Sequence, residues 1–177
     1  DDEVNLRVGR ATSSRTLGLD KIVEFVNRAR RAGVRIKLNT VVHAHNWRED
    51  LVEVVASLRP ERWKVFQVLP VAGQNDCDDL LVTPAQFAAF VERHRERIPT
   101  GTVLVPETND DITGSYAMID PAGRFFDNTR GRLRYSEPIN QVGIKEAWAQ
   151  VAFSRERFED RGGQYDWSPR LVQLRIP

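Results

Sequence analysis

Two short segments with strand-like alternation carry polar or positively charged side chains on one face. In the first, Lys37 and Asn39 alternate with aliphatic residues; in the second, Arg62 and Lys64 fall on the same face as Phe66. Side chains alternate between the two faces of a strand, so each set points to one side of a sheet. A cation on the inner face of a buried strand is costly unless an anion meets it. Two such strands with a helix between them therefore predict a pocket for a polyphosphate.

The alternative for these cations is structural. Lysine and arginine side chains at strand ends can lie along apolar surface and place their charged groups in water. The pattern alone leaves both interpretations open.

The composition limits the classes of protein and of site. The chain of 177 residues has a net charge of +1, which argues against a general nucleic-acid-binding or membrane surface. It contains no apolar run long enough to span a bilayer and no signal peptide. Its single cysteine, Cys77, excludes an internal disulfide and a metal cluster held by several thiolates of this chain. These features predict a cytoplasmic protein domain.

Helical and strand-like segments alternate up to about residue 110. The expected order is a helix over 19–32, a strand over 34–42, a helix starting at Asn46, a strand over 62–69, a helix starting at Thr83 and a strand over 102–106. Asn46 has Glu49 three residues on as a capping-box partner, and Thr83 has Gln86. The alternation implies parallel strands with helices outside, as in a βα sheet or barrel, where sites lie at the carboxyl ends of strands.

The chain changes character from about residue 111. Residues 115–119 and 123–126 flank a turn signal that begins at Asp120, and they predict a β-hairpin. Residues 143–153 form a short predicted helix, and residues 161–167 a glycine-hinged tail.

Two residues near the predicted strand ends are further candidates. Glu107 directly follows a strand, where its carboxylate would accept hydrogen bonds from a sugar hydroxyl; the alternative is a loop residue in a turn. Tyr116 lies next to the predicted mouth of the site, where a phenol can stack, donate a hydrogen bond or hand over a hydrogen atom. The alternative for Tyr116 is a half-buried strand aromatic.

The histidines and the cysteine give weaker signals. His43 and His45 have the spacing of a metal-binding pair but no third ligand at matching spacing, so a loop between strand and helix is the preferred interpretation. His94 lies on an arginine-rich helix end and is expected at the surface. Cys77 has acidic neighbours, which oppose thiolate formation, and is expected to be unreactive.

A series of motifs resembles the viperin-like radical S-adenosylmethionine enzymes over essentially the whole chain. The motifs, in order, are Val8-Gly9-Arg10, Lys37-Leu38-Asn39, Asn46, Arg62-Trp63-Lys64-Val65-Phe66-Gln67, Val105-Pro106-Glu107-Thr108-Asn109, Ser115-Tyr116, Arg124-Phe125, Gly131-Arg132, Val142-Gly143 and Arg161-Gly162-Gly163-Gln164-Tyr165-Asp166-Trp167-Ser168. The motif of residues 62–67 and the tail motif of residues 161–168 are specific for this family when they occur together.

The resemblance implies an α/β fold in two parts. Residues 1–110 would be the C-terminal portion of a partial (βα)6 radical-SAM barrel, and residues 111–177 an extension of hairpin, helix and lid tail that covers the nucleotide site. Members of the family bind a 4Fe–4S cluster through a Cys-x-x-x-Cys-x-x-Cys loop and cleave S-adenosylmethionine. The deoxyadenosyl radical takes the 4′ hydrogen of a nucleoside triphosphate. Loss of the 3′ hydroxyl as water and one electron from an external donor give the 3′-deoxy-3′,4′-didehydro nucleotide, an antiviral chain terminator.

The same resemblance assigns roles to individual residues. Arg10 would pair with the carboxylate of S-adenosylmethionine, and Tyr116 would donate the hydrogen atom that closes the reaction. The residues assigned to the nucleotide are Lys37, Asn39, Arg62, Lys64, Glu107, Arg161 and Tyr165. Among them, the strand cations would contact the triphosphate, and Glu107 would hold the ribose. Arg161 and Tyr165 would come from the lid tail. CTP is the expected substrate, with UTP and GTP as alternatives.

The chain also departs from the family pattern. The cysteine loop and the strands before it are missing, so the chain is expected to be the C-terminal part of a longer enzyme and inactive alone. Whether the missing part carries an amphipathic membrane anchor stays open. Asn128 stands where animal members have a cysteine, and Leu133 where a lysine is expected. A relay through that cysteine and a phosphate contact from that lysine are therefore in doubt.

Two alternatives from other classes stay open. The chain would then be a nucleotide-binding or interaction module without redox chemistry, or a βα-barrel enzyme acting on a sugar phosphate. The sequence gives neither the nucleobase nor the oligomeric state.

Overall fold

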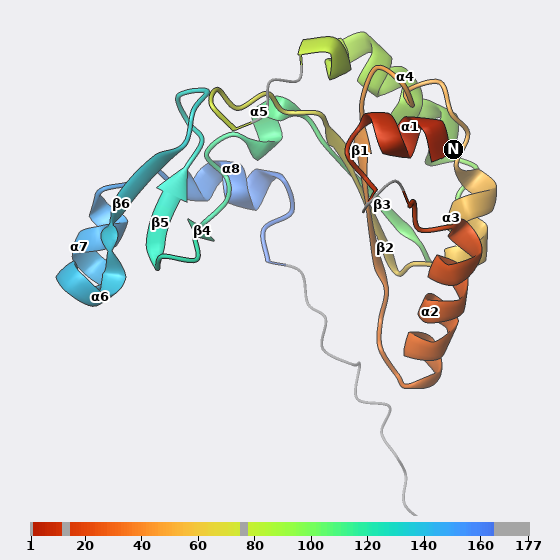
Figure 1. Ribbon diagram of the computed structural model, residues 1–177, viewed down its shortest axis with the longest axis horizontal. Helices are drawn as coiled ribbons and strands as arrows, with labels where there is room; N and C mark the ends of the chain where they lie inside the picture. The colour runs from red at the N-terminus through yellow and green to blue at the C-terminus, as the bar shows by residue number, and fades with distance from the viewer. Residues whose placement is uncertain (1, 12–14, 75–77, 165–177) are drawn as a thin grey trace, which may run out of the picture. The chain divides into compact units, whose positions relative to one another are not determined.

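The chain divides into two compact units (Figure 1). The computed structural model describes residues 2–11, 15–74 and 78–164. The first unit comprises Asp1–Pro70 and Asn75–Asp110, and the second comprises Val71–Gln74 and Asp111–Pro177. Helices and parallel strands alternate in the first unit, whereas an antiparallel sheet forms the centre of the second.

The first unit has the predicted alternation of helices and strands. Its elements are α1 (Asp2–Arg7), α2 (Leu19–Arg31), β1 (Lys37–Val42), α3 (Val52–Leu58), β2 (Arg62–Gln67), the short 3-10 helix η1 (Asp78–Leu80), α4 (Pro84–Arg95) and β3 (Val103–Glu107). The strands form one parallel sheet in the order β1-β2-β3, which confirms the predicted α/β class with parallel strands. Within the described residues this sheet has three strands and does not close into a barrel.

One face of the parallel sheet is covered by helices and forms the core of the unit. Trp63 and Val65 of β2 are fully buried there, in one cluster with Val55 of α3 and Phe90 of α4. The indole N–H of Trp63 donates to the hydroxyl oxygen of Thr40 over 2.9 Å. The only polar atom of the largest core side chain is therefore paired inside the core.

The N-terminus of α4 has the capping box that the sequence predicts. The Thr83 hydroxyl oxygen accepts from the Gln86 N–H over 3.2 Å, and the Gln86 side-chain oxygen accepts from the Thr83 N–H over 2.8 Å. Two donors of the first helical turn, which have no partner within a helix, are thus satisfied.

The helix predicted to begin at Asn46 begins instead at Val52. The Asn46 side-chain oxygen accepts from the His43 N–H over 2.8 Å, and its amide donates to the Val41 carbonyl over 2.9 Å. Asn46 therefore closes a turn toward β1, because its amide can pair with backbone groups outside a helix as well as at a helix start.

His94 is buried, and its prediction as a surface residue is wrong. Its side chain has no exposed area, and its ring meets that of Trp63 edge-on at 5.2 Å between centres. The His94 Nε2 accepts from the Leu51 N–H over 2.9 Å, while Nδ1 lies 2.7 Å from the Phe90 carbonyl oxygen. Burial lowers the pKa of His94 against the smaller opposing effects of Phe90 and Asp50, which favours the neutral ring.

The second unit contains the predicted hairpin. Its elements are β4 (Met118–Ile119), β5 (Arg124–Asp127), β6 (Arg134–Pro138), α6 (Ile139–Val142), α7 (Ile144–Ala149) and α8 (Arg155–Asp160), and α5 (Asn109–Ile112) crosses from the first unit into it. The strands pair antiparallel in the order β4-β5-β6. At the turn, the Asp120 carboxylate accepts from the Arg124 side chain and from the backbone N–H groups of Arg124 and Ala122, which lowers the pKa of Asp120.

A buried carboxylate joins two distant parts of this unit. Asp127, which is 1% exposed, accepts from the N–H of Thr129 and from the N–H of Ala152, at 3.0 and 2.9 Å. Burial alone would raise the pKa of Asp127, but these donors and the Thr129 hydroxyl together lower it. Asp127 is thus held as a charged acceptor inside the unit.

In the part of the chain that the structure describes, every helix is too short or too polar to cross a lipid bilayer.

Candidate functional site

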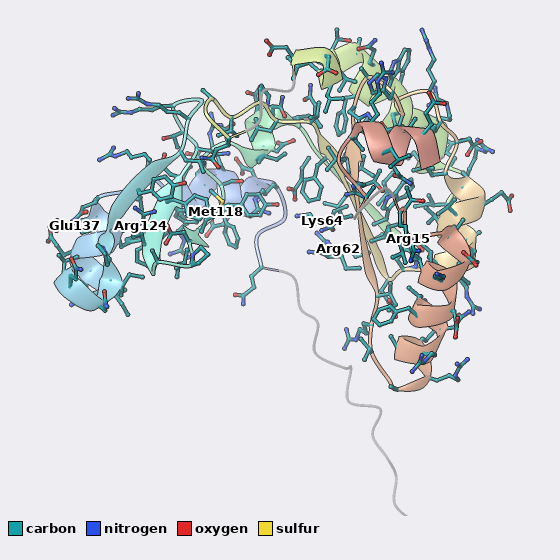
Figure 2. All side chains as sticks on the ribbon, viewed as in Figure 1. Arg15, Arg62, Lys64, Met118, Arg124 and Glu137 are labelled. Atoms are coloured by element: carbon teal, nitrogen blue, oxygen red, sulfur yellow. The ribbon has the colours of Figure 1, made fainter. Side chains whose placement is uncertain are left out.

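The register of the parallel sheet brings the predicted nucleotide residues of the first unit to one face. Lys37 lies beside Arg62, and Asn39 lies beside Lys64 in the next row. Glu107 ends β3, two positions beyond the residue paired with Lys64. Residues two apart on a strand point to the same side, so all five lie opposite the helix-covered core. Figure 2 shows Arg62 and Lys64 projecting from that side of the strands, which we call the polar face.

Exposure varies along the polar face. Lys37 and Asn39 are exposed and Arg62 is half-buried, whereas Lys64 and Glu107 are 3% and 1% exposed. The Lys64 ammonium forms an ion pair with a Glu107 carboxylate oxygen. One end of the polar face is therefore open to solvent, and the other is a buried ion pair.

The ion pair joins two residues for which the sequence predicts separate partners. Lys64 is expected on a phosphate and Glu107 on a ribose, yet the structure pairs the two with each other. A buried carboxylate without such a cation would be strongly unfavourable. A ligand that binds Lys64 or Glu107 therefore contacts an ion pair, not an isolated charge.

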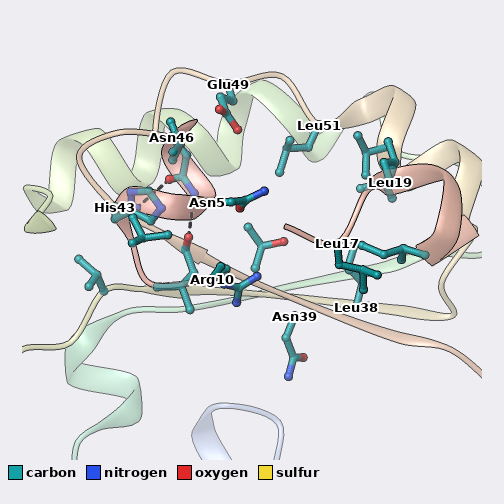
Figure 3. A pocket seen from close by; sticks show the side chains of 18 of the residues that line it. Asn5, Arg10, Leu17, Leu19, Leu38, Asn39, His43, Asn46, Glu49 and Leu51 are labelled. Atoms are coloured by element: carbon teal, nitrogen blue, oxygen red, sulfur yellow. Dashed lines mark hydrogen bonds between the residues drawn. The ribbon is translucent and has the colours of Figure 1, made fainter. Parts of the chain in front are cut away.

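A cavity of about 650 Å³ lies beside β1, between the strand and the helices (Figure 3). Its apolar lining includes Leu17, Leu19, Leu38 and Leu51, and its polar lining includes Asn5, Arg10, Asn39, His43, Asn46 and Glu49. Arg10, which the resemblance assigns to S-adenosylmethionine, lines this cavity, whereas Asn39, assigned to the nucleotide, borders it at β1 and extends its side chain to the other side of the strand (Figure 3). A mixed lining of this kind suits a ligand with both apolar and charged groups.

His43 supplies a buried imidazole to this cavity. Its Nδ1 accepts from the His45 N–H over 3.2 Å, so a proton of the neutral ring resides on Nε2. Burial, followed by the charges of His45 and Arg10, lowers the pKa of His43. The residue is therefore a neutral donor near pH 7.

The chain's own residues do not fit a 4Fe–4S cluster. The sequence has one cysteine, Cys77, which lies outside the described residues, so three thiolate ligands are not present in this chain. Among residues 2–11, 15–74 and 78–164, no three histidine, cysteine or acidic side chains gather as metal ligands would. His43 and His45 belong to no such group, although their rings meet edge-on at 5.9 Å between centres.

Two predicted residues meet in the second unit. The guanidinium carbon of Arg161 lies 3.9 Å from the centre of the Tyr116 ring, and Arg161 also donates to the Ser115 carbonyl over 2.9 Å. Tyr116 is half-buried. Tyr165, the other tail residue predicted to bind the nucleotide, lies outside the described residues.

Sequence reasoning missed two polar residues that shape the first unit. His43 does lie in the predicted loop, but sequence reasoning weighs it only as a metal ligand and not as a cavity residue, although it follows the carboxyl end of β1, where sites of parallel sheets gather. Gln67 is buried at the end of β2; its amide donates to the Val82 carbonyl over 3.1 Å and its oxygen accepts from the Asn109 N–H over 3.2 Å. Gln67 thereby fixes the segment that follows Glu107. Its position at a strand end was the available signal.

Curated proteins are similar to this chain over nearly all of its length. No protein-family model matches the chain. An S-adenosylmethionine-dependent nucleotide dehydratase of Lacinutrix mariniflava is 42% identical over 98% of this chain and 36% of its own length. Dehydratases of the same description from Flammeovirga pacifica and Danio rerio are 42% and 36% identical, over 94% and 98% of this chain.

The chain spans about half the length, or less, of several curated relatives it matches, with shares of 36%, 57% and 49% for these three. The order of motifs along the chain and the length of the matches agree. The resemblance predicted from the sequence is thus confirmed: over 94–98% of its length the chain is similar to proteins described as S-adenosylmethionine-dependent nucleotide dehydratases.

Proposed function

We propose that this chain supplies the nucleotide-binding part of an S-adenosylmethionine-dependent nucleotide dehydratase. The whole protein would dehydrate a nucleoside triphosphate, CTP or alternatively UTP or GTP, to the 3′-deoxy-3′,4′-didehydro nucleotide. The observation that carries the proposal is the polar face, where two rows of adjacent strands present Lys37, Asn39, Arg62 and Lys64 together. The names of the relatives support the reaction class.

The exposed end of the polar face suits the triphosphate. Lys37 and Arg62 lie side by side there, and a guanidinium can bind a phosphate through two parallel hydrogen bonds. Asn39 adds an amide donor in the next row. The Lys64–Glu107 pair then lies toward the ribose, where the carboxylate would accept from a sugar hydroxyl.

The cofactor would be S-adenosylmethionine, held through its carboxylate by Arg10 at the cavity beside β1. The ligands of a 4Fe–4S cluster would have to come from residues outside this sequence, so we do not expect turnover by the chain alone. We further propose that residues 1–110, with β1, β2 and β3, form the C-terminal portion of a partial (βα)6 barrel. The role of residues 111–177 as an extension over the site stays a prediction.

The test uses the full-length protein, reconstituted anaerobically with S-adenosylmethionine, a reductant and each nucleoside triphosphate. Formation of deoxyadenosine together with a nucleotide lighter by one water is expected, and both are measured by mass spectrometry. No deoxyadenosine with any nucleotide would reject the proposal.

Binding by this chain separates the alternatives. Isothermal titration with nucleoside triphosphates and sugar phosphates should show binding of the former, weakened in Arg62→Gln and unchanged in Arg28→Gln, an exposed cation on α2. Nucleotide binding by this chain, with no cleavage of S-adenosylmethionine by the reconstituted full-length protein, would favour a binding module. A preference for sugar phosphates would favour another barrel enzyme.

A further inference from the structure

Arg161 contacts both the ring of Tyr116 and the backbone next to it. Its guanidinium lies 3.9 Å from the Tyr116 ring centre and 5.1 Å from that of Phe158, so aromatic rings border it at two places. Its Nη2 donates to the carbonyl of Ser115, the residue before Tyr116. The contact therefore fixes the tyrosine at its side chain and at its main chain.

Both ends of this contact are themselves anchored. Ser115 is fully buried, and its hydroxyl donates to the Asp111 carbonyl. Arg161 is the C-cap residue directly after α8, with its N–H donating to the Arg157 carbonyl over 3.3 Å. Because neither backbone is held only by this contact, the stacked pair has a defined geometry.

A cation over an aromatic face is attracted by the negative charge density of the ring. Guanidinium is planar and stacks, whereas a lysine ammonium is a compact point charge without such a plane. The N–H groups of a guanidinium donate in its own plane, so stacking on Tyr116 is compatible with the nucleotide contact predicted for Arg161. The orientation of the ring then depends on arginine in particular, not on positive charge alone.

We propose that Arg161 is a positioning residue that sets the orientation of the Tyr116 phenol. The inference rests on the proposed function, in which Tyr116 supplies a hydrogen atom. When the 3′ hydroxyl leaves as water, it takes up one electron and one proton. The Tyr116 O–H bond breaks and supplies both, leaving a neutral tyrosyl radical, which the external electron donor reduces with uptake of a proton from water.

The matched control is Arg157, one turn earlier on α8. It donates from Nη1 to the Thr113 carbonyl over 3.3 Å, so it also joins α8 to the segment before Tyr116. Arg157→Lys and Arg161→Lys change the same side chain in the same way on the same helix. Only the second removes the stack on Tyr116.

The first measurement does not need turnover. The chain has three tyrosines, and fluorine NMR of the chain labelled with 3-fluorotyrosine gives a signal for each. Tyr116→Phe identifies its signal, and an unchanged Tyr135 signal, from β6 of the same unit, shows that a variant is folded. Arg161→Lys should move or broaden the Tyr116 signal, and Arg157→Lys should leave it in place. A Tyr116 signal that is the same in Arg161→Lys and the parent overturns the proposal.

The second measurement uses the reconstituted full-length enzyme and compares nucleotide product with deoxyadenosine formed. A mispositioned tyrosine should lower this ratio in Arg161→Lys about five-fold, because hydrogen transfer fails after cleavage. A raised KM with an unchanged ratio would assign Arg161 to binding alone and overturn positioning. If the parent forms no deoxyadenosine, the proposed function fails, while the fluorine signal still decides whether Arg161 orients Tyr116.

Discussion

The two faces of the parallel sheet come from the same strands but differ in what surrounds them. On one face, Trp63 and Val65 are fully buried among helices. On the other, the buried Lys64–Glu107 pair gives way to the exposed Lys37. The comparison teaches that a strand with alternating side chains can stabilise the fold through one face and keep the other for charge. Substitutions on the two faces should therefore have different consequences.

The largest effect is expected on the covered face. Trp63→Ala would remove the largest buried side chain of the core and leave a cavity, at a cost of about 4 kcal/mol in the free energy of unfolding. Urea denaturation of the chain, followed by circular dichroism, measures this change. A loss below about 1 kcal/mol would mean that this face is not the stabilising one.

The next effect is expected at the buried end of the polar face. Lys64→Met would leave the Glu107 carboxylate without its cation and should cost roughly 3 kcal/mol in unfolding free energy. The double variant Lys64→Met/Glu107→Leu should recover most of that loss, because no uncompensated charge is left. If the double variant is as unstable as the single one, the pair is not the cause.

A smaller effect is expected at His94, behind the covered face. His94→Leu would leave the Leu51 N–H without its acceptor, at a cost of about 2 kcal/mol. The lowered pKa of His94 means that the unfolded chain takes up a proton before the folded one does. The contribution of His94 to the free energy of unfolding is therefore complete above its usual pKa of 6.5, and it declines as the pH falls below that value.

Unfolding free energies at several pH values test this sign. The parent should lose stability more steeply than His94→Leu between pH 7 and the lowered pKa. His43, whose pKa is also lowered, supplies a remaining slope of the same direction in both proteins. Equal slopes would contradict the assignment to His94.

The smallest effect on stability is expected at the exposed end of the polar face. Lys37→Ala and Asn39→Ala should change the unfolding free energy by less than about 0.5 kcal/mol. If the proposed function is right, each should still weaken nucleoside triphosphate binding about ten-fold, since each removes a donor to the ligand. Calorimetric titration measures this, with Arg28→Gln as the control.

Sequence reasoning succeeded where one local rule decides the structure. Period-two alternation placed Lys64 and Trp63 on opposite faces, and the residues around Thr83 gave the start of α4. The parallel pairing of the strands followed from the alternation of helices and strands. These features depend on short stretches of chain and on general packing rules.

It failed where tertiary contacts override local composition. The arginines around His94 suggested a surface, but His94 continues the apolar stripe of Phe87, Phe90 and Val91 at helical spacing. Asn46 has a helix-start pattern, yet its side chain pairs with the backbone of His43 and of Val41 in β1. The pairing of Lys64 with Glu107 joins residues 43 positions apart, which alternation cannot reveal. The stacking of Arg161 on Tyr116 likewise arises only in the folded chain.

The hydrogen bond from the Ala152 N–H to Asp127 joins the two ends of a long segment of the second unit. This contact closes a loop of 25 residues that includes β6, α6 and α7. Closing a loop of this length is opposed mainly by chain entropy, so its ends should separate in one cooperative step. The Ala152 amide should then exchange its hydrogen only when that segment opens, and acid that protonates Asp127 should accelerate the exchange. A single amide would thereby report the local unfolding of the whole segment.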